Sequence, residues 1–356
     1  MRSGAFSYEA LPVRVIFGVG AAAALPQEVD RLGLQRVMVI STAGRADQGR
    51  SVAKLLSHRV GAVCDAARMH TPVAVTEQVL ATVERERIDG LVAVGGGSAI
   101  GLAKAVALRT DLPQIAIPTT YAGSEATPII GQTQDGIKTT QRSLRVLPEV
   151  VVYDVDLTLG LPVAVSVASG MNAMAHAAEA LYAQDGNPVI DLLAEEAVRR
   201  LVRALPLIVA DPTDRAARSD ALYGAWLCGT CLGAVGMSLH HKLCHTLGGG
   251  FGLPHAETHS VILPHALAYN LAAAPQARER LARAIGADDP AGGLHRLALT
   301  LGAPTSLQLL GLPAEAIDEA ADLAMRNPYW NPRPFDRAAL RALLARAWAG
   351  AAPCAD

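Results

Sequence analysis

The sequence predicts an α/β protein of two domains, in which a parallel sheet with covering helices is followed by an all-helical domain. Strand and helix patterns alternate up to Val155, which is typical of a parallel sheet covered on both faces. From Val163 onward the pattern is rich in Ala and Leu, with helical spacing and almost no strand signal. A length of 356 residues suits two domains. We expect them to span residues 1–157 and 158–356.

Short β-branched runs mark the strands of the first domain. They lie at 13–17, 36–40, 91–94, 114–117 and 150–155, and helices are predicted over 74–86 and 98–109. In the second domain the predicted helices are 166–184, 188–208, 214–247, 261–272, 276–286, 292–301, 314–326 and 336–348. Ligands of open α/β sheets bind beyond the carboxyl ends of the strands. We therefore expect the active site in a cleft between the two domains.

Composition and charge exclude several classes of function. Lys and Arg total 31 against 33 Asp and Glu, so a formal charge of −2 gives no reason to expect a nucleic-acid partner. The uncharged stretch 221–239 is long enough for a membrane span, but it holds four glycines and has no companion, so we expect a buried helix and no membrane partner. Five scattered cysteines and an N-terminus without a signal-peptide pattern predict a cytoplasmic protein.

Three turns that follow strands carry residues expected to bind a dinucleotide. In the first, three glycines and a serine separate a strand from a helix, so backbone N–H groups and a hydroxyl face a phosphate. The alternative is an ordinary βα turn, which the strand-and-helix context disfavours. The third turn lacks the acidic residue that would bind the adenosine ribose, so NADH and NADPH both remain open. The predicted cofactor-binding residues are Gly95, Gly96, Gly97, Ser98, Lys104, Thr119, Thr120, Ser124, Ser41 and Thr42.

Half of the ten histidines lie between Ser238 and Ser260. His241 and His245 are four residues apart and share a helix face, as do Asn172 and His176. Two helices and one loop could then bring Asn172, His176, His241 and His255 together. Three imidazoles can hold a catalytic zinc, but this set has no anionic member. His245 is left as an acid–base residue, and the alternative for any single histidine is a polar core residue.

These motifs together resemble the iron-containing alcohol dehydrogenase family. The matching features are GGGS…AK at 95–104, PTT…GSE at 118–125, the Asn172/His176 pair, and H-x-x-x-H…PH at 241–255. The resemblance implies a dinucleotide fold, a helical domain, NAD(P) as cofactor and a homodimer. The family's first metal ligand is an aspartate, and Asn172 stands at that position here.

Within the family the chain is most similar to the maleylacetate reductase branch, which reduces the carbon–carbon double bond of maleylacetate with NADH or NADPH in the breakdown of aromatic compounds. That resemblance implies a site in which a metal is not required. The predicted catalytic residues are His245 as proton donor, His241, His176, His255, Asn172 and Lys242. A dicarboxylate substrate calls for cations, so Lys242 and Arg142 are expected to bind it, and Tyr121 of the second turn is included with them.

Two alternatives remain at this stage. A metal-dependent NAD(P) alcohol or aldehyde dehydrogenase of the same fold would hold its metal tightly. A nucleotide-binding protein without catalysis would explain the amide at Asn172, but it would not need the persisting histidines and phosphate turns.

Overall fold

The structure is a computed structural model that describes residues 5–134 and 137–355. It divides into two compact units, one made of Leu11–Leu161 and one made of the described residues before Leu11 together with those from Pro162 onward. The predicted fold class is confirmed. The chain passes between the units at Pro162, slightly later than the expected boundary after residue 157, because a turn of 3-10 helix at Val155–Thr158 still follows the last strand of the sheet.

The first unit contains a six-stranded sheet in which every pair of neighbouring strands is parallel. In spatial order the strands are β1 (Arg14–Gly18), β8 (Val150–Asp154), β5 (Gln114–Pro118), β4 (Gly90–Gly95), β2 (Val37–Ile40) and β3 (Val60–Cys64). Sequence patterning missed β3, whose residues alternate only weakly, and the antiparallel hairpin of β6 (Ile129–Gln134) and β7 (Ile137–Arg142).

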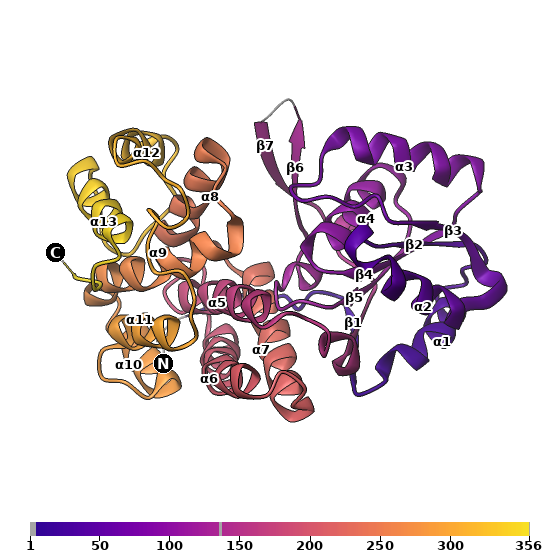
Figure 1. The fold of residues 1–356 in the computed structure, drawn as a ribbon, viewed down its shortest axis with the longest axis horizontal. Helices are drawn as coiled ribbons and strands as arrows, with labels where there is room; N and C mark the ends of the chain where they lie inside the picture. The colour runs from indigo at the N-terminus through magenta and orange to yellow at the C-terminus, as the bar shows by residue number, and fades with distance from the viewer. Residues whose placement is uncertain (1–4, 135–136, 356) are drawn as a thin grey trace. The chain divides into compact units, whose positions relative to one another are not determined.

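Alternating strand residues bury both faces of this sheet. One face packs on α1 (Leu25–Arg31) and α2 (Ala46–Leu56), with Val92, Val94 and Ile117 among the shared core residues. The opposite face is covered by α3 (Val73–Arg85) and α4 (Gly97–Thr110), which lie beside each other in Figure 1. The carboxyl ends of β2, β4 and β5 lead directly into the three turns that carry the predicted cofactor residues.

The second unit is helical throughout its described elements. Its helices are α5 (Val163–Ala180), α6 (Pro188–Ala210), α7 (Arg215–Ala234), α8 (Leu239–Phe251), α9 (His255–Asn270), α10 (Pro275–Ile285), α11 (Pro290–Thr300), α12 (Ala316–Met325) and α13 (Arg337–Ala349). All eight helical segments predicted here contain helix, but one of them holds two helices instead of one.

The prediction of one helix over 214–247 is wrong. The helix stops at Ala234, Val235 is extended, and a new helix begins at Leu239. The buried carboxylate of Glu179 accepts hydrogen bonds from the backbone N–H groups of Ser238 and His240. Such an acceptor stabilises a new helix start, since the first N–H groups of a helix lack partners within it. The break falls within the uncharged stretch 221–239, which the helical spacing did not divide.

The connection between α8 and α9 is short. α8 runs to Phe251 and its C-cap is Gly252, which adopts a left-handed backbone (φ 65°) that glycine accepts without strain. His255 is the first residue of α9. Three helices therefore carry the site, instead of two helices and a loop.

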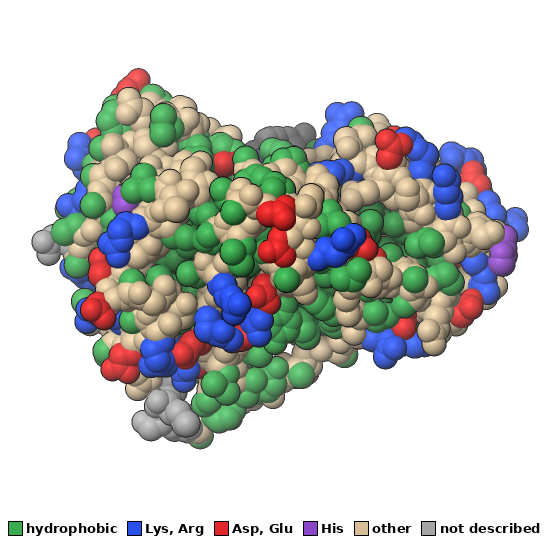
Figure 2. Space-filling view, turned by 60° about the horizontal axis from the view of Figure 1, so that its bottom comes forward, with side chains coloured by type: hydrophobic (Ala, Val, Ile, Leu, Met, Phe, Trp, Pro, Cys, Tyr) green, Lys and Arg blue, Asp and Glu red, His purple; other side chains and the backbone are tan. Residues whose placement is uncertain are grey.

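Surface charge and helix length are the features of the structure that concern nucleic-acid and membrane partners. On the face in Figure 2, basic and acidic side chains are interspersed without a continuous patch of one sign. Among the described residues, no single helix is long and apolar enough to cross a membrane. Only α7 and α8 taken together reach that length and composition, as a pair bent by 95°.

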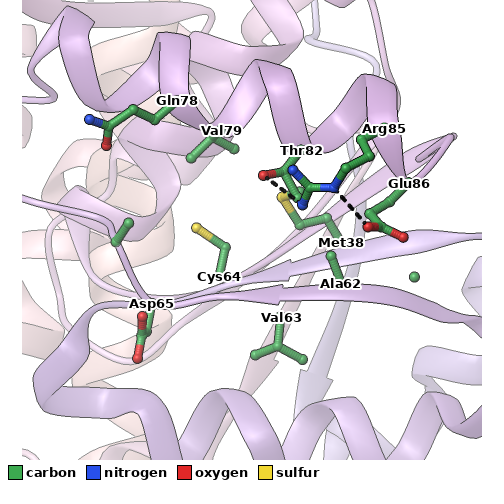
Figure 3. A pocket seen from close by; sticks show the side chains of 12 residues that line it. Met38, Ala62, Val63, Cys64, Asp65, Gln78, Val79, Thr82, Arg85 and Glu86 are labelled. Carbon is green, nitrogen blue, oxygen red and sulfur yellow. Dashed lines mark hydrogen bonds and ion pairs between the residues drawn. The ribbon is translucent and has the colours of Figure 1, made fainter.

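A groove with a volume of about 530 Å³ opens between the outer strand β3 and α3. Figure 3 shows the Cys64 side chain on the groove side of β3, with the Arg85 guanidinium bonded to Glu86 at one end. None of the predicted cofactor or catalytic residues lines the groove.

Candidate active site

Histidines from three helices of the second unit form one group. α5 contributes His176, α8 contributes His240, His241 and His245, and α9 contributes His255 and His259. Neighbouring rings in the group have centroids 4.4 to 6.4 Å apart. The structure brings together His176, His241, His245 and His255, which the spacing argument grouped, and it adds His240 and His259 to them.

A chain of hydrogen bonds runs through the centre of this group. His176 Nδ1 lies 2.8 Å from His241 Nε2, and His241 Nδ1 lies 2.7 Å from Glu179 Oε2. All three side chains are buried. When Glu179 is a carboxylate, His241 donates from Nδ1 and accepts at Nε2, so His176 donates from Nδ1. A proton added to the chain appears as an N–H at His176 Nε2, the outer end.

Glu179 was not predicted from the sequence. Besides His241 it accepts the backbone N–H groups of His240 at 2.8 Å and Ser238 at 2.9 Å. Burial raises the pKa of Glu179 to about 7 despite these donors, and burial lowers the pKa of His241 to about 3. One signal could have revealed it: Glu179 is the only acidic or basic residue, histidine aside, in the 18 residues of α5. A lone carboxylate in an apolar helix needs buried partners.

A second group of contacts surrounds His245. Its Nδ1 lies 3.0 Å from the hydroxyl of Tyr329, and the Lys242 Nζ lies 5.8 Å from the centre of the same tyrosine ring. Lys242 also donates to the carbonyl of Arg326 at 2.6 Å, and partial burial lowers its pKa. The structure thus supports the expected place of Lys242 beside His245. Tyr329 was missed because 84 residues separate it from His245.

Asn172 lies one turn before His176 on α5 and is 5% exposed. Its Oδ1 is buried and has no hydrogen-bond partner among the described residues. An unpaired buried acceptor costs free energy, so this amide oxygen is placed to receive a donor that the chain itself does not supply.

In the first unit, the glycines 95–97 form the turn between β4 and α4, as the sequence predicts. Gly95 ends β4 with φ 145°, and a Cβ on Gly96 would lie 2.8 Å from the Thr120 side chain. Gly97 is exposed and a Cβ there would meet no heavy atom within 4 Å. The first and second turns are tied together by the Thr119 N–H, which donates to the Gly95 carbonyl at 3.0 Å. Ser98, Thr120, Ser124 and Thr42 are partly exposed, whereas Ser41 is buried beneath Gly49 of α2.

Two of the predicted contacts are not supported by the geometry. Lys104 is buried, and its Nζ donates to the carbonyls of Ser124, Thr127 and Ile129 at 2.6 to 2.9 Å. Those bonds use all three N–H groups of an ammonium, so Lys104 holds the second turn instead of contacting a phosphate. Tyr121 is completely buried, which removes it from the surface that a substrate can touch. Arg142 is exposed at the end of β7.

Comparison with known proteins decides the family. Residues 12–155 match the profile of the iron-containing alcohol dehydrogenases, and residues 166–348 match the C-terminal profile of the same family. The chain belongs to the iron-containing alcohol dehydrogenase family. The resemblance of its phosphate turns and histidine spacing is therefore confirmed.

Relatives within this family cover nearly the whole chain. The maleylacetate reductase of Burkholderia cepacia is 55% identical over 349 residues, which are 98% of this chain and 99% of that protein. The maleylacetate reductase of Rhizobium sp. (strain MTP-10005) is 54% identical over the same shares. Among solved structures, the maleylacetate reductase from Agrobacterium tumefaciens has a TM-score of 0.96 and 53% identity, covering 99% of this chain and all of that one.

The family name implies an iron ion, so the donor set must be tested against one. The imidazoles of the set that the resemblance assigns to iron, those of His176, His241 and His255, are neutral ligands. Asn172 offers a neutral oxygen, and the carboxylate of Glu179 is held by two backbone N–H groups and the far nitrogen of His241. Iron favours a set that includes an anionic oxygen ligand. These residues do not fit an iron ion held in the family's manner.

Proposed function

We propose that the chain is a maleylacetate reductase, which reduces the carbon–carbon double bond of maleylacetate with NADH or NADPH to give 3-oxoadipate. The names and full-length similarity of its relatives support this substrate. The single observation that carries the mechanism is the buried hydrogen-bonded chain Glu179–His241–His176, which can present a donor to a developing oxyanion without a metal.

The substrate has an alkene conjugated to a ketone. Hydride from nicotinamide C4 forms a bond to the alkene carbon β to the ketone, and the electron pair of the double bond moves onto the ketone oxygen as an enolate. The enolate then collapses as the α carbon takes a proton. A donor aimed at the developing oxyanion contributes about 3 kcal/mol to such a step. His176, with its N–H supplied through the buried chain, serves as that donor, with His241 behind it. His255, whose ring lies 6.4 Å from that of His245, is a second candidate.

His245 delivers the proton to the α carbon. The donor form of the ring is the imidazolium, in which Nδ1–H donates to the Tyr329 hydroxyl at 3.0 Å and Nε2–H gives the proton, leaving neutral imidazole. Tyr329 therefore orients His245. The proton is replaced from water, so the enzyme returns to its starting state after each turnover.

The carboxylates of the substrate need cationic partners. The Lys242 Nζ lies 5.8 Å from the centre of the Tyr329 ring, and one of its N–H groups is bound to the Arg326 carbonyl. We propose that its remaining N–H groups bind one carboxylate. Arg142 is a weaker candidate for the second carboxylate, because its exposed side chain is better solvated.

The cofactor binds through the turns after β4, β5 and β2. Gly96, Gly97 and Ser98 present N–H groups at the start of α4, where the helix dipole favours a phosphate. We expect Thr42 and Arg45, in the turn after β2, to face the adenosine ribose, where an acidic residue would select NADH, so NADPH is accepted as well. We further propose that the protein acts in the cytoplasm as a homodimer, without a metal, as the resemblance implies.

Product analysis with deuterated cofactor tests this function. Maleylacetate reduced with [4-²H]NAD(P)H should yield 3-oxoadipate that carries deuterium on the carbon β to the ketone, as seen by proton and deuterium NMR. Deuterium on a carbinol carbon would instead mean reduction of the ketone, and the alcohol dehydrogenase alternative would replace the proposal. Tight cofactor binding without any product would favour the binding protein.

A further inference from the structure

We propose a second binding site in the histidine group, in which His240, Cys244 and His259 bind a zinc ion or a similar borderline cation. Their potential ligand atoms lie within 4.8 Å of one another, and all three residues are buried. None of them belongs to the set that the family resemblance assigns to iron. The site does not depend on the proposed substrate or reaction.

The distances suit a tetrahedral ion. Zinc–nitrogen and zinc–sulfur bonds of about 2.05 and 2.3 Å place tetrahedral ligands about 3.3 Å apart for two nitrogens and about 3.6 Å apart for nitrogen and sulfur. His240 Nε2 lies 2.9 Å from His259 Nδ1, and Cys244 Sγ lies 3.6 Å from His240 Nε2. The two rings need to separate by only a few tenths of an ångström.

A hydrogen bond between the rings does not by itself explain their burial. His240 Nδ1 and His259 Nε2 are both buried and have no hydrogen-bond partner among the described residues. In either tautomer of the pair, one of these atoms is an unmet donor and the other an unmet acceptor. An apolar pair would fold without this penalty, so the imidazoles serve something other than packing.

The local charges favour a divalent cation. Burial keeps both imidazoles neutral by holding their pKa values well below the usual value, so their ring nitrogens can act as ligands without losing a charge. Burial and the negative charge of Glu179 raise the pKa of the Cys244 thiol. A divalent ion would displace the thiol proton to solvent, one proton for each ion bound, and it would offset both the thiolate and the Glu179 charge.

Occupation of this site should inhibit the enzyme. The His259 ring lies 4.4 Å from the His255 ring and 5.0 Å from the His241 ring, so an ion that draws His259 toward Cys244 also displaces the contacts of the two histidines assigned to the reaction.

Cobalt binding to the metal-free full chain tests the site directly. Co²⁺ should bind with a near-ultraviolet thiolate-to-cobalt charge-transfer band, and Zn²⁺ should displace it. Cys244→Ser should abolish the band and weaken binding at least about 10- to 100-fold, whereas Cys228→Ser, at another buried cysteine on α7, should leave both unchanged. Circular dichroism checks that each variant is folded.

A second pair of variants covers the case in which Cys244→Ser does not fold. His259→Gln should weaken cobalt binding, and His265→Gln, at a buried histidine two turns later on α9, should not. Absence of cobalt binding, binding without the thiolate band, or equal affinity in Cys244→Ser would overturn the proposal. Because binding is read without turnover, its failure is distinct from a failure of the proposed reaction.

Discussion

At the scale of single residues, Glu179 is the group on which most of the site depends. Two backbone N–H groups reach its two carboxylate oxygens, and His241 bonds to one of them. The same side chain therefore sets where α8 starts and how His241 and His176 face. Sequence spacing found the histidines because i, i+4 periodicity is local, but it could not find a carboxylate whose partners lie 59 to 62 residues away.

Glu179→Gln should lower kcat by about 100-fold, comparable to the loss of an oriented donor. A glutamine offers one acceptor where the N–H groups of Ser238 and His240 need two, so the start of α8 and the His241 ring must shift. The variant should also lose about 1–3 kcal/mol of stability, while its affinity for NADH stays within a factor of two. Glu319→Gln, at an exposed position on α12, is the matched control. A kcat for Glu179→Gln equal to that of the control would contradict the role.

Lys242→Met should raise KM for the dicarboxylate about 10- to 100-fold, the effect of losing a charge-assisted hydrogen bond. Methionine keeps most of the side-chain volume, so the melting temperature should change little. Lys54→Met, on the exposed side of α2, controls for a loss of net charge. Steady-state kinetics at saturating cofactor separate KM from kcat. An unchanged KM would exclude Lys242 from substrate binding.

At the scale of elements, the strand-to-helix turns followed from the sequence more closely than the helical segments did. The glycines at 95–97 mark a turn that only small residues can form, so β4 and α4 were predicted within a residue of their ends. The break between α7 and α8 and the edge strand β3 were missed. Both are fixed by tertiary contacts, the first by Glu179 and the second by pairing with β2.

Two alanine variants of the phosphate turn should behave differently. Gly96→Ala places a Cβ 2.8 Å from Thr120, so it should lower the melting temperature and weaken NADH binding together. Gly97→Ala meets open space within the protein and should leave stability unchanged, yet weaken NADH binding because the methyl group takes room needed by the phosphate. Thermal unfolding and fluorescence titration separate the two effects. Normal NADH affinity in Gly97→Ala would mean that the phosphate lies elsewhere.

The histidines of α8 and α9 should make the fold sensitive to acid. Burial lowers the pKa of His241 to about 3 and holds those of His240 and His259 well below 6.5. The unfolded chain takes up these protons below pH 6.5 while the folded chain does not, so stability falls from pH 6.5 toward pH 3. Each histidine lowers the free energy of unfolding by about 2 kcal/mol between pH 6.5 and 5.

Glu179 acts in the opposite direction, because its raised pKa makes the folded state hold a proton that the unfolded chain releases between about pH 4.5 and 7. The stability that Glu179 adds on acidification offsets the loss from about one of the three histidines. Urea unfolding at pH 7 and pH 5 should still show a net loss, smaller in His259→Gln. Equal stability at both pH values would show that the imidazoles are protonated within the fold.

At the scale of the whole molecule, the sequence identified the fold class, the family and the residues of one site, since each rests on periodicity or on motifs within short segments. The family match and the full-length relatives confirm the fold class and the family. What it could not supply was the set of contacts between residues distant in the sequence: the Tyr329 hydroxyl with His245, the His240–His259 pair, and the bond from Lys104 to the second turn. These contacts join residues between 19 and 84 positions apart, and no local pattern encodes them.

In the proposed mechanism the chain Glu179–His241–His176 does the work of the family's metal. The measurement that tests this most sharply is NADH oxidation with maleylacetate by chelator-treated protein whose metal content has been checked by elemental analysis. We expect full activity without metal and no activation by added Fe²⁺ or Zn²⁺. Activity that disappears with the metal and returns with a divalent ion would contradict it, and Asn172 would then have to be counted as a metal ligand.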